Sequence, residues 1–161
     1  MYTLSIKKLH PDAKIPTAAT ELAAGNDLYS IERTTISPNS IARIRTGIAL
    51  EMPKYHYGRL ADRSSMAIRG LQIVGGVIDC DYRGEIIVLM RNNTNRKVTL
   101  GKGNKIAQFI LTKISYCNFD VVEFFSSDTE RGGKGFGSSG RTEVVDILYT
   151  LTQCFDYGFE S

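Results

Sequence analysis

Short apolar stretches recur along the chain, each bounded by residues that favour turns. Residues 34–36 are β-branched and precede the turn-forming residues 37–40. Residues 41–45 alternate along the chain with the period of two that a half-buried strand requires. Further apolar runs at 85–90 and 105–114 lie next to turns rich in asparagine or glycine. Strands spaced at roughly ten residues, with little helix between them, predict an all-β barrel or jelly roll.

The C-terminal part of the chain departs from this pattern. Residues 126–140 are polar and rich in glycine, which predicts a flexible arm. Beyond the arm, apolar residues at helical spacing follow Thr142 and predict a short helix. These residues are Val144, Ile147, Leu148 and Leu151. The chain therefore divides into a β-barrel (1–125), the glycine-rich arm and a C-terminal extension (141–161) whose role the sequence leaves open.

Composition and charge narrow the class of protein. The 161 residues suffice for one domain, and the formal charge of +3 is too small to require a polyanionic partner. No apolar run approaches the ~18–20 residues of a membrane-spanning helix, and the N-terminus lacks the features of a secretory signal. We therefore expect an intracellular protein, cytoplasmic or nuclear, that binds neither membrane nor nucleic acid directly.

The histidines and cysteines exclude several kinds of site. His10 and His56 are far apart, and neither is flanked by cysteines or carboxylates at ligand spacing, which argues against a histidine zinc site or a Ser/His/Asp triad. The three cysteines form no CxxC pair, so we expect reduced thiols. Any catalysis should depend on carboxylates, basic groups, hydroxyls and backbone amides.

The glycines are concentrated in the arm. Five of the 15 fall in residues 131–140, which read Arg-Gly-Gly-Lys-Gly-Phe-Gly-Ser-Ser-Gly. Without side chains, backbone N–H groups can gather around an anion, and the basic and hydroxyl residues add donors, so a polyphosphate is the natural ligand. Phe136 could stack on a nucleobase. On composition alone, a plain linker fits slightly better.

A second candidate site spans residues 75–84. Its paired glycines permit close backbone approach to a flat ligand. Asp79 and Asp81 share a face if the segment is extended, and a carboxylate near a phosphate-bound metal can act as a general base. Tyr82 adds a rigid aromatic wall. The alternative is a hairpin turn in which both aspartates are turn formers.

Three further positions are ambiguous when taken singly. Residues 63–65, Arg-Ser-Ser, resemble a helix start that could bind phosphate, although a helix cap without a ligand is the common alternative. Gln108 lies in an apolar strand and, if buried, needs a hydrogen-bond partner from the protein or from a ligand. Asp27 precedes a strand and has the ordinary interpretation of a turn residue.

Taken together and in order, five segments resemble the five motifs of the trimeric dUTPase family (deoxyuridine triphosphate nucleotidohydrolases). They are residues 23–30, 63–67, 76–84, 103–110 and 131–140. The resemblance implies a distorted jelly-roll subunit and a homotrimer whose active sites are shared between subunits, with the fifth motif donated as a swapped arm. It also implies Mg²⁺-assisted hydrolysis of dUTP to dUMP and pyrophosphate, which limits uracil incorporation into DNA and supplies dUMP for dTTP synthesis.

The resemblance implies roles for single residues at the nucleoside end of the substrate. Asp79 would activate the water that attacks the α-phosphorus. Tyr82 would pack under the deoxyribose, and backbone groups near Gly75 and Gly76 would recognise uracil. Asp27 would lie near the metal and contact it through water.

The other implied residues would surround the phosphates. The set from the barrel is Arg63, Ser64, Ser65 and Gln108. The set from the arm, which would close over the γ-phosphate and the base, is Arg131, Phe136, Gly137, Ser138 and Ser139.

The second motif departs most from the family pattern. Asp62 stands where the family usually has proline, Ser65 where it has glycine, and Met66 where it has leucine. A carboxylate at position 62 predicts weaker phosphate binding or an altered pairing of Arg63. Two other functions stay open: a dCTP deaminase of related fold, and a nucleotide-gated regulatory protein. The intact Asp79 argues against a role in binding alone.

Overall fold

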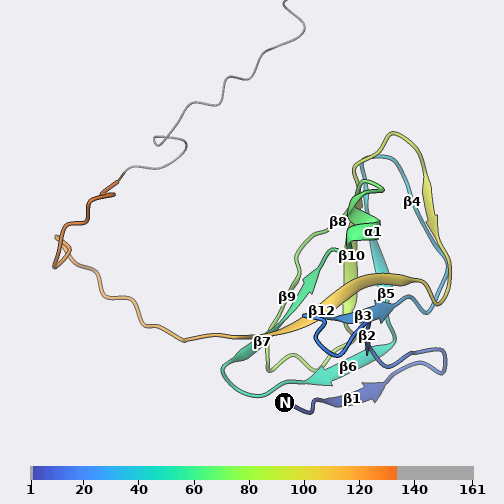
Figure 1. Ribbon diagram of the computed structural model, residues 1–161, viewed down its shortest axis with the longest axis horizontal. Helices are drawn as coiled ribbons and strands as arrows, with labels where there is room; N and C mark the ends of the chain where they lie inside the picture. Colours follow the sequence, from blue (N-terminus) through green and yellow to red (C-terminus); the bar gives the residue numbers. More distant parts are fainter. Residues whose placement is uncertain (1, 134–161) are drawn as a thin grey trace, which may run out of the picture. The chain divides into compact units, whose positions relative to one another are not determined.

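The computed structural model describes residues 2–133, and these form an almost entirely β structure (Figure 1). The strands are β1 (Ser5–Lys8), β2 (Thr17–Ala18), β3 (Asn26–Tyr29), β4 (Thr34–Ile36), β5 (Ile41–Arg45), β6 (Ile48–Glu51), β7 (His56–Ala61), β8 (Leu71–Ile73), β9 (Val77–Ile78), β10 (Ile87–Asn92), β11 (Val98–Leu100) and β12 (Lys105–Lys113). The helix described is the single turn α1 (Ser64–Ala67). The all-β class expected from the short apolar stretches is confirmed.

The strands form antiparallel sheets, and the largest of them positions most of the candidate residues. Its order is β2-β3-β12-β7-β9. The second sheet has the order β5-β10-β8, and the remaining strands form the pairs β1-β6 and β11-β4. Strand β12 is central, because it pairs with β3 on one side and with β7 on the other. Residues far apart in the sequence thus become neighbours along β12.

The core lies between the inward faces of these sheets. Alternation along β5 illustrates how the sequence selects that face, since Ile44 is fully buried whereas Ile41, Arg43 and Arg45 are exposed. The largest fully buried apolar side chains are Leu28, Ile36, Ile44, Ile48, Leu71, Ile86, Val88, Met90, Leu100 and Ile106. Burial of aliphatic side chains at about 25 cal/mol per Å² of apolar surface is the main term that stabilises such a barrel.

The observed boundaries agree closely with those expected at three of the four strands. Strands β4 and β5 have the predicted bounds, and β12 ends one residue before the predicted end of its run. Strand β10 begins at Ile87 rather than at Glu85, because the main-chain groups of Ile86 bond outside the ladder: its amide donates to the Ile48 carbonyl at 2.8 Å, and its carbonyl accepts from the Thr46 hydroxyl at 2.6 Å. Regular pairing with β5 starts only after this residue.

The barrel unit comprises Met1–Asn118, and a second unit begins at Phe119. The described part of the second unit, residues 119–133, contains turns and bends and no strand or helix. The C-terminal helix expected after Thr142 lies outside the described residues. Within residues 2–133, no helix is long and apolar enough to cross a membrane. Cys80 and Cys117 are free, as expected.

Candidate active site

A buried carboxylate, Asp27, joins two basic side chains at one end of the large sheet. Strand β3 places it opposite Gln108 of β12, and only 7% of the residue is exposed. Arg63 Nε donates to Asp27 Oδ1 at 2.7 Å, and Lys105 Nζ donates to Oδ2 at 2.8 Å. Each carboxylate oxygen therefore has a charge-assisted bond, and the cluster of Asp27, Arg63 and Lys105 (the anion cluster) carries a net positive charge.

The protonation of the anion cluster follows from these contacts. Burial alone would raise the pKa of the Asp27 carboxyl, but the hydrogen bonds and charges of Lys105 and Arg63 outweigh burial and lower that pKa below its ordinary value. The hydrogen bond to Asp27 likewise raises the pKa of Lys105. The Asp27 carboxyl and the Lys105 amine are therefore both charged at neutral pH, and the charged Lys105 favours a bound polyanion.

The segment after β7 presents hydroxyls beside this cluster. Residues 63–67 form the expected helix start, with Arg63 at the N-cap of α1, but no side chain caps the helix. The hydroxyls of Ser64 and Ser65 are therefore not used for capping, and both residues are exposed. Arg63 Nη1 instead reaches the Lys105 carbonyl at 3.2 Å and the Ser65 hydroxyl at 3.4 Å. Arg63 thus links the helix start to β12.

Gln108 completes the same end of the sheet. Its Nε2 donates to the main-chain oxygen of Asp62 at 2.7 Å. A Cβ added at Gly25 would lie 2.6 Å from Gln108 Oε1, so glycine at position 25 leaves the room that this side chain occupies. The partner that the sequence required for Gln108 is a protein carbonyl, and one amide hydrogen and the oxygen are left for other contacts.

The second candidate group lines a pocket of about 310 Å³. Asp79, Tyr82 and Gly75 contribute to it, and its remaining lining is mostly aliphatic: Val77, Ile78, Ile87 and Leu89, with Arg43 and Glu85. Gly75 has φ +62°, a conformation that disfavours other residues. The pocket combines a carboxylate, an exposed aromatic ring and an apolar lining, which suits a nucleoside better than a free phosphate.

A turn, rather than an extended segment, carries Asp79 and Tyr82. Strand β9 ends at Ile78, and the Tyr82 amide donates to the Asp79 carbonyl at 3.1 Å. The segment is therefore not extended, so the condition under which Asp79 and Asp81 would share a face is not met. It is a turn, as in the alternative, but the turn does not join a hairpin, because β9 pairs with β7 whereas β10 pairs with β5 and β8. Arg83 Nη1 closes the turn by donating to the carbonyls of Cys80 at 2.7 Å and Tyr82 at 3.1 Å.

Strand β7 keeps the two groups apart within one chain. At one end of β7, Gly58 pairs with Ile78 of β9, which places Asp79 opposite Tyr57. At the other end, Ala61 pairs with Gln108 of β12, and Arg63 lies just beyond the strand. Six residues of extended chain from position 57 to position 63 span about 20 Å. Asp79 and Arg63 therefore lie toward opposite ends of β7, whereas the Gly76 end of the pocket lies beside Leu60.

Lys105 and Arg83 are the residues of this region that sequence reasoning missed. Lys105 directly precedes the apolar run of the fourth motif, and only its pairing with Asp27 across β3 and β12 distinguishes it from a surface lysine. Arg83 lies within the third motif, between Tyr82 and Gly84, and this position in the motif could have identified it from the sequence. Among the arm residues, Arg131 is described, and Phe136, Gly137, Ser138 and Ser139 lie outside the described residues.

No protein cage for a metal is present in the described part of the chain, where no group of three or more His, Cys, Asp or Glu residues could hold an ion. Asp27 is the residue that the sequence suggested as a metal contact, and both of its carboxylate oxygens already accept hydrogen bonds from basic side chains. A Mg²⁺ ion bound chiefly by phosphate oxygens and water fits this arrangement, because it needs no dedicated set of protein ligands.

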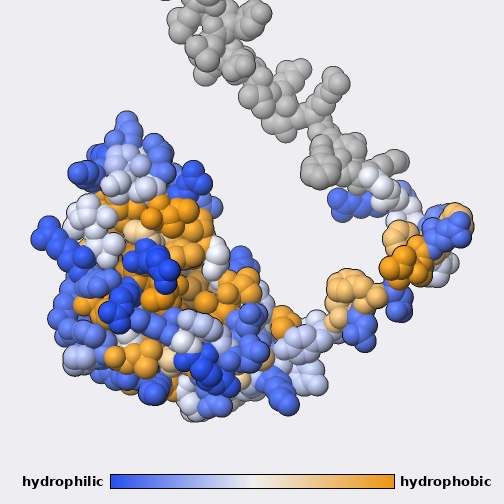
Figure 2. Space-filling view, turned by 180° about the vertical axis from the view of Figure 1, so that it is seen from behind, coloured by the Kyte–Doolittle hydropathy of each residue, from blue (hydrophilic) through white to orange (hydrophobic). Residues whose placement is uncertain are grey.

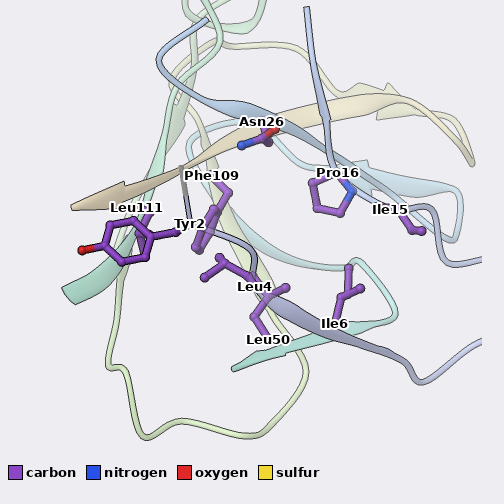
Figure 3. A pocket seen from close by; sticks show the side chains of 9 residues that line it. All are labelled: Tyr2, Leu4, Ile6, Ile15, Pro16, Asn26, Leu50, Phe109 and Leu111. Atoms are coloured by element: carbon purple, nitrogen blue, oxygen red, sulfur yellow. The ribbon is translucent and has the colours of Figure 1, made fainter. Parts of the chain in front are cut away.

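A separate apolar groove of about 250 Å³ lies on the barrel (Figure 3). Its lining comes from β1 and the residues before it, the segment before β2, and strands β3, β6 and β12: Tyr2, Leu4, Ile6, Ile15, Pro16, Asn26, Leu50, Phe109 and Leu111. None of the predicted site residues contributes to it. Phe109 and Leu111 alternate with Gln108 along β12, so they point to the opposite face of the sheet.

Comparison with known proteins agrees with this geometry. The family model described as dUTPase matches residues 11–140. The deoxyuridine 5'-triphosphate nucleotidohydrolases of rabbitpox virus (strain Utrecht) and vaccinia virus (strain Copenhagen) are each 45% identical over 128 residues, covering 80% of this chain and 86% of theirs.

Solved structures show the same fold. A Staphylococcus bacteriophage 80alpha dUTPase with dUPNHPP superposes with a TM-score of 0.82 at 29% identity, covering 88% of this chain and 100% of that chain. A dUTPase mutant from phage phi11 of S. aureus, described with a structural Mg(II) ion, gives a TM-score of 0.73 at 25% identity, with 78% and 100% coverage.

These findings place the chain among nucleotide hydrolases with a jelly-roll fold, and they confirm the expected fold class. The chain belongs to the dUTPase family, and it is an enzyme of the dUTP diphosphatase class.

Proposed function

We propose that this chain hydrolyses dUTP to dUMP and pyrophosphate by in-line attack of an Asp79-activated water on the α-phosphorus, assisted by Mg²⁺. The observation that carries the proposal is the pocket whose lining brings together Asp79, Tyr82 and Gly75. A general base, a flat aromatic surface and accessible main-chain groups are what this reaction needs from a nucleoside site.

Two features of the pocket support selection of a deoxynucleoside. The Tyr82 hydroxyl donates to the Glu85 carbonyl at 3.1 Å, which fixes the ring while leaving 45% of the residue exposed. A ring held in this way can pack under deoxyribose and exclude a 2′-hydroxyl by steric contact. Main-chain groups around Gly75 and Gly76 would recognise the uracil edge.

The phosphates would bind at the anion cluster and the adjacent serines. Arg63, held by Asp27, supplies a planar donor group, Ser64 and Ser65 supply hydroxyls, and Gln108 supplies an amide. Mg²⁺ bound to the triphosphate would neutralise further charge. Asp79 accepts the proton of the attacking water, and pyrophosphate leaves from the opposite side of the α-phosphorus.

Because β7 separates Asp79 from Arg63, we infer that each site combines groups from different chains. A homotrimer with shared sites satisfies this requirement, and the arm, through Arg131 and residues 136–139, would close over the bound nucleotide. Apolar areas lie on the barrel face shown in Figure 2, with hydrophilic groups between and around them. Such an area on a barrel of this size is typical of a subunit interface.

In the cell, this reaction would limit uracil incorporation into DNA and provide dUMP for dTTP synthesis, in the cytoplasm or the nucleus. No direct contact with nucleic acid is required for it.

The test is pyrophosphate release measured side by side with dUTP, UTP, dTTP and dCTP in the presence of Mg²⁺. We expect turnover of dUTP at least about 100-fold above the other three, because ribose, the thymine methyl group and cytosine are each excluded by contacts in the pocket. Ammonia release from dCTP, or equal turnover of UTP, would contradict the proposal.

A further inference from the structure

Asp62 makes two contacts at the point where three elements of the candidate site meet. It follows the last residue of β7 and directly precedes Arg63. Its Oδ1 accepts from the Ile73 amide of β8 at 2.5 Å, and its main-chain oxygen accepts from Gln108 Nε2 at 2.7 Å. One residue thus connects residues 62–65 at the start of α1 (the phosphate loop) with β8 and β12.

The contact with Gln108 determines which way the side-chain amide faces. A carbonyl oxygen can accept only from the NH₂ group, so the amide nitrogen must lie toward the loop that carries Arg63 and Ser64. The second amide hydrogen is then available to a phosphate oxygen on the same side. In the flipped orientation, the Gln108 oxygen would face the phosphate and repel it.

Any residue at position 62 would offer a main-chain oxygen to Gln108. The role of the Asp62 carboxylate must therefore lie in its own contact. The bond from Ile73 tethers the side chain of Asp62 to β8 and thereby fixes its backbone. Proline, which the family pattern has at this position, restricts the backbone through its ring instead. Arg63 binds Asp27, and the described residues show no ion pair between Arg63 and the Asp62 carboxylate.

We propose that Asp62 is a positioning residue: its carboxylate, bonded to the Ile73 amide, holds its carbonyl where it orients Gln108 for phosphate binding. The inference rests on the proposed function, because it assumes that the substrate phosphates bind beside Gln108.

The experiment is a double-mutant cycle between Asp62→Ala and Gln108→Met, with Asp62→Asn as the conservative variant. It measures the Kd of the non-hydrolysed analogue dUPNHPP by calorimetry, and KM and kcat for dUTP by pyrophosphate release. We expect Asp62→Ala to raise Kd and KM about three- to tenfold and to change kcat less than about twofold, since one hydrogen bond to a charged ligand is weakened. Asp62→Asn keeps the Oδ1 acceptor and should bind within about twofold of the wild type.

In the Gln108→Met background, Asp62→Ala should change Kd less than about twofold, because the group that it positions is absent. Asp12→Ala, which removes another exposed carboxylate with polar partners, serves as the matched control and should leave Kd unchanged.

Three results would overturn the inference. One is an equal loss of affinity from Asp62→Ala in both backgrounds, and another is tighter binding by both Asp62 variants, which would show charge repulsion. The third, wild-type affinity of Gln108→Met, applies even if Asp62→Ala fails to fold. If the wild-type protein binds dUPNHPP but releases no pyrophosphate from dUTP, only the proposed hydrolysis is contradicted. The double-mutant cycle measured in Kd would still test the role of Asp62.

Discussion

At the residue scale, Asp27 shows how a buried charge can be kept for a purpose other than stability. Two cations compensate the carboxylate, and in doing so both are held at the surface beside the phosphate loop. Such pairs contribute little net stability compared with apolar residues of similar volume, whereas removal of one partner is costly. Asp27 is best understood as the group that keeps Arg63 and Lys105 in place.

The first prediction concerns the replacement Asp27→Asn, which leaves Arg63 and Lys105 side by side without their counter-charge. We expect it to lower the free energy of unfolding by about 2–4 kcal/mol at pH 7, measured by urea denaturation. Because folding lowers the pKa of Asp27, its stabilisation is present above its ordinary value of 3.8 and is lost as the pH falls through the folded-state pKa.

The difference in the free energy of unfolding between wild type and Asp27→Asn should therefore become smaller at about pH 2–3, below the ordinary Asp pKa of 3.8. Asp12→Asn is the matched control, because Asp12 forms a pair of similar length with Lys102 in an exposed setting. If Asp12→Asn destabilised the protein as much as Asp27→Asn does, burial of the Asp27 carboxylate would not be the cause of the effect.

The second prediction concerns Asp79. Replacement by asparagine removes the proton acceptor with almost no change of shape, so kcat for dUTP should fall by at least about 100-fold while the Kd of dUPNHPP stays within about threefold. Asp81→Asn, in the same turn, should keep most of the turnover. Wild-type turnover by Asp79→Asn would show that another group activates the water.

The identity of the candidate residues could be predicted from the sequence, but their contacts could not. Asp27, Arg63 and Gln108 are recognisable from motif order, whereas the charge pairing of Asp27 with Lys105 depends on the register of β3 against β12. Register is a property of two segments nearly eighty residues apart, and no local pattern in either encodes the partner.

At the element scale, the short strand β9 sets the position of the turn that carries Asp79. It pairs with β7 through Gly58 and Arg59, and the Gly76 carbonyl extends the ladder by accepting from the Leu60 amide at 2.7 Å. A Cβ added at Gly76 would collide with the main-chain oxygen of Leu60. Close approach of two backbones therefore requires glycine at this position.

The third prediction follows from that contact. Gly76→Ala should lower the free energy of unfolding by about 1–3 kcal/mol and raise the KM for dUTP, because the collision displaces β9 and the turn that follows it. Thermal unfolding and dUTP kinetics measure the two effects. Gly101→Ala is the control, since its added Cβ would make only ordinary contacts. Equal stability of the two variants would rule out the steric explanation.

Elements were predictable from the sequence where alternation and turn residues agree, as in β4, β5 and β12. They were less predictable where a residue bonds outside its own strand. Residues 85 and 86 were expected in a strand, yet the main-chain groups of Ile86 bond to the Ile48 carbonyl and the Thr46 hydroxyl, and β10 begins after them. Likewise, the hydroxyls of residues 64 and 65 suggested a capped helix, but α1 has no side-chain cap.

At the scale of the whole molecule, the separation of Asp79 from Arg63 allows a sharp test of the shared site. Asp79→Asn disables the pocket of a chain, and Arg63→Ala disables its anion cluster while Lys105 still neutralises Asp27. If each site takes the two groups from different chains, a random trimer made from equal amounts of the two variants has about a quarter of its sites intact.

The fourth prediction is therefore that co-refolded Asp79→Asn and Arg63→Ala chains recover up to about a quarter of the wild-type dUTP turnover. Each variant refolded alone should remain nearly inactive. If both groups came from the same chain, no mixed site would be intact, and the mixture would be no more active than its parents. Light scattering on the same samples reports whether the mixtures are trimers.

The length of chain from Tyr57 in β7 to Arg63, just beyond the strand, has a consequence for how a defect in one subunit affects the others. Where a site lies wholly within one chain, a defective copy inactivates only itself. With the groups divided as proposed here, a copy that lacks both Asp79 and Arg63 would spoil one site through its pocket and a second through its anion cluster. In a cell with one normal and one doubly defective gene, such a variant would act dominantly. Even normal chains would be inactive when diluted below the concentration at which they assemble.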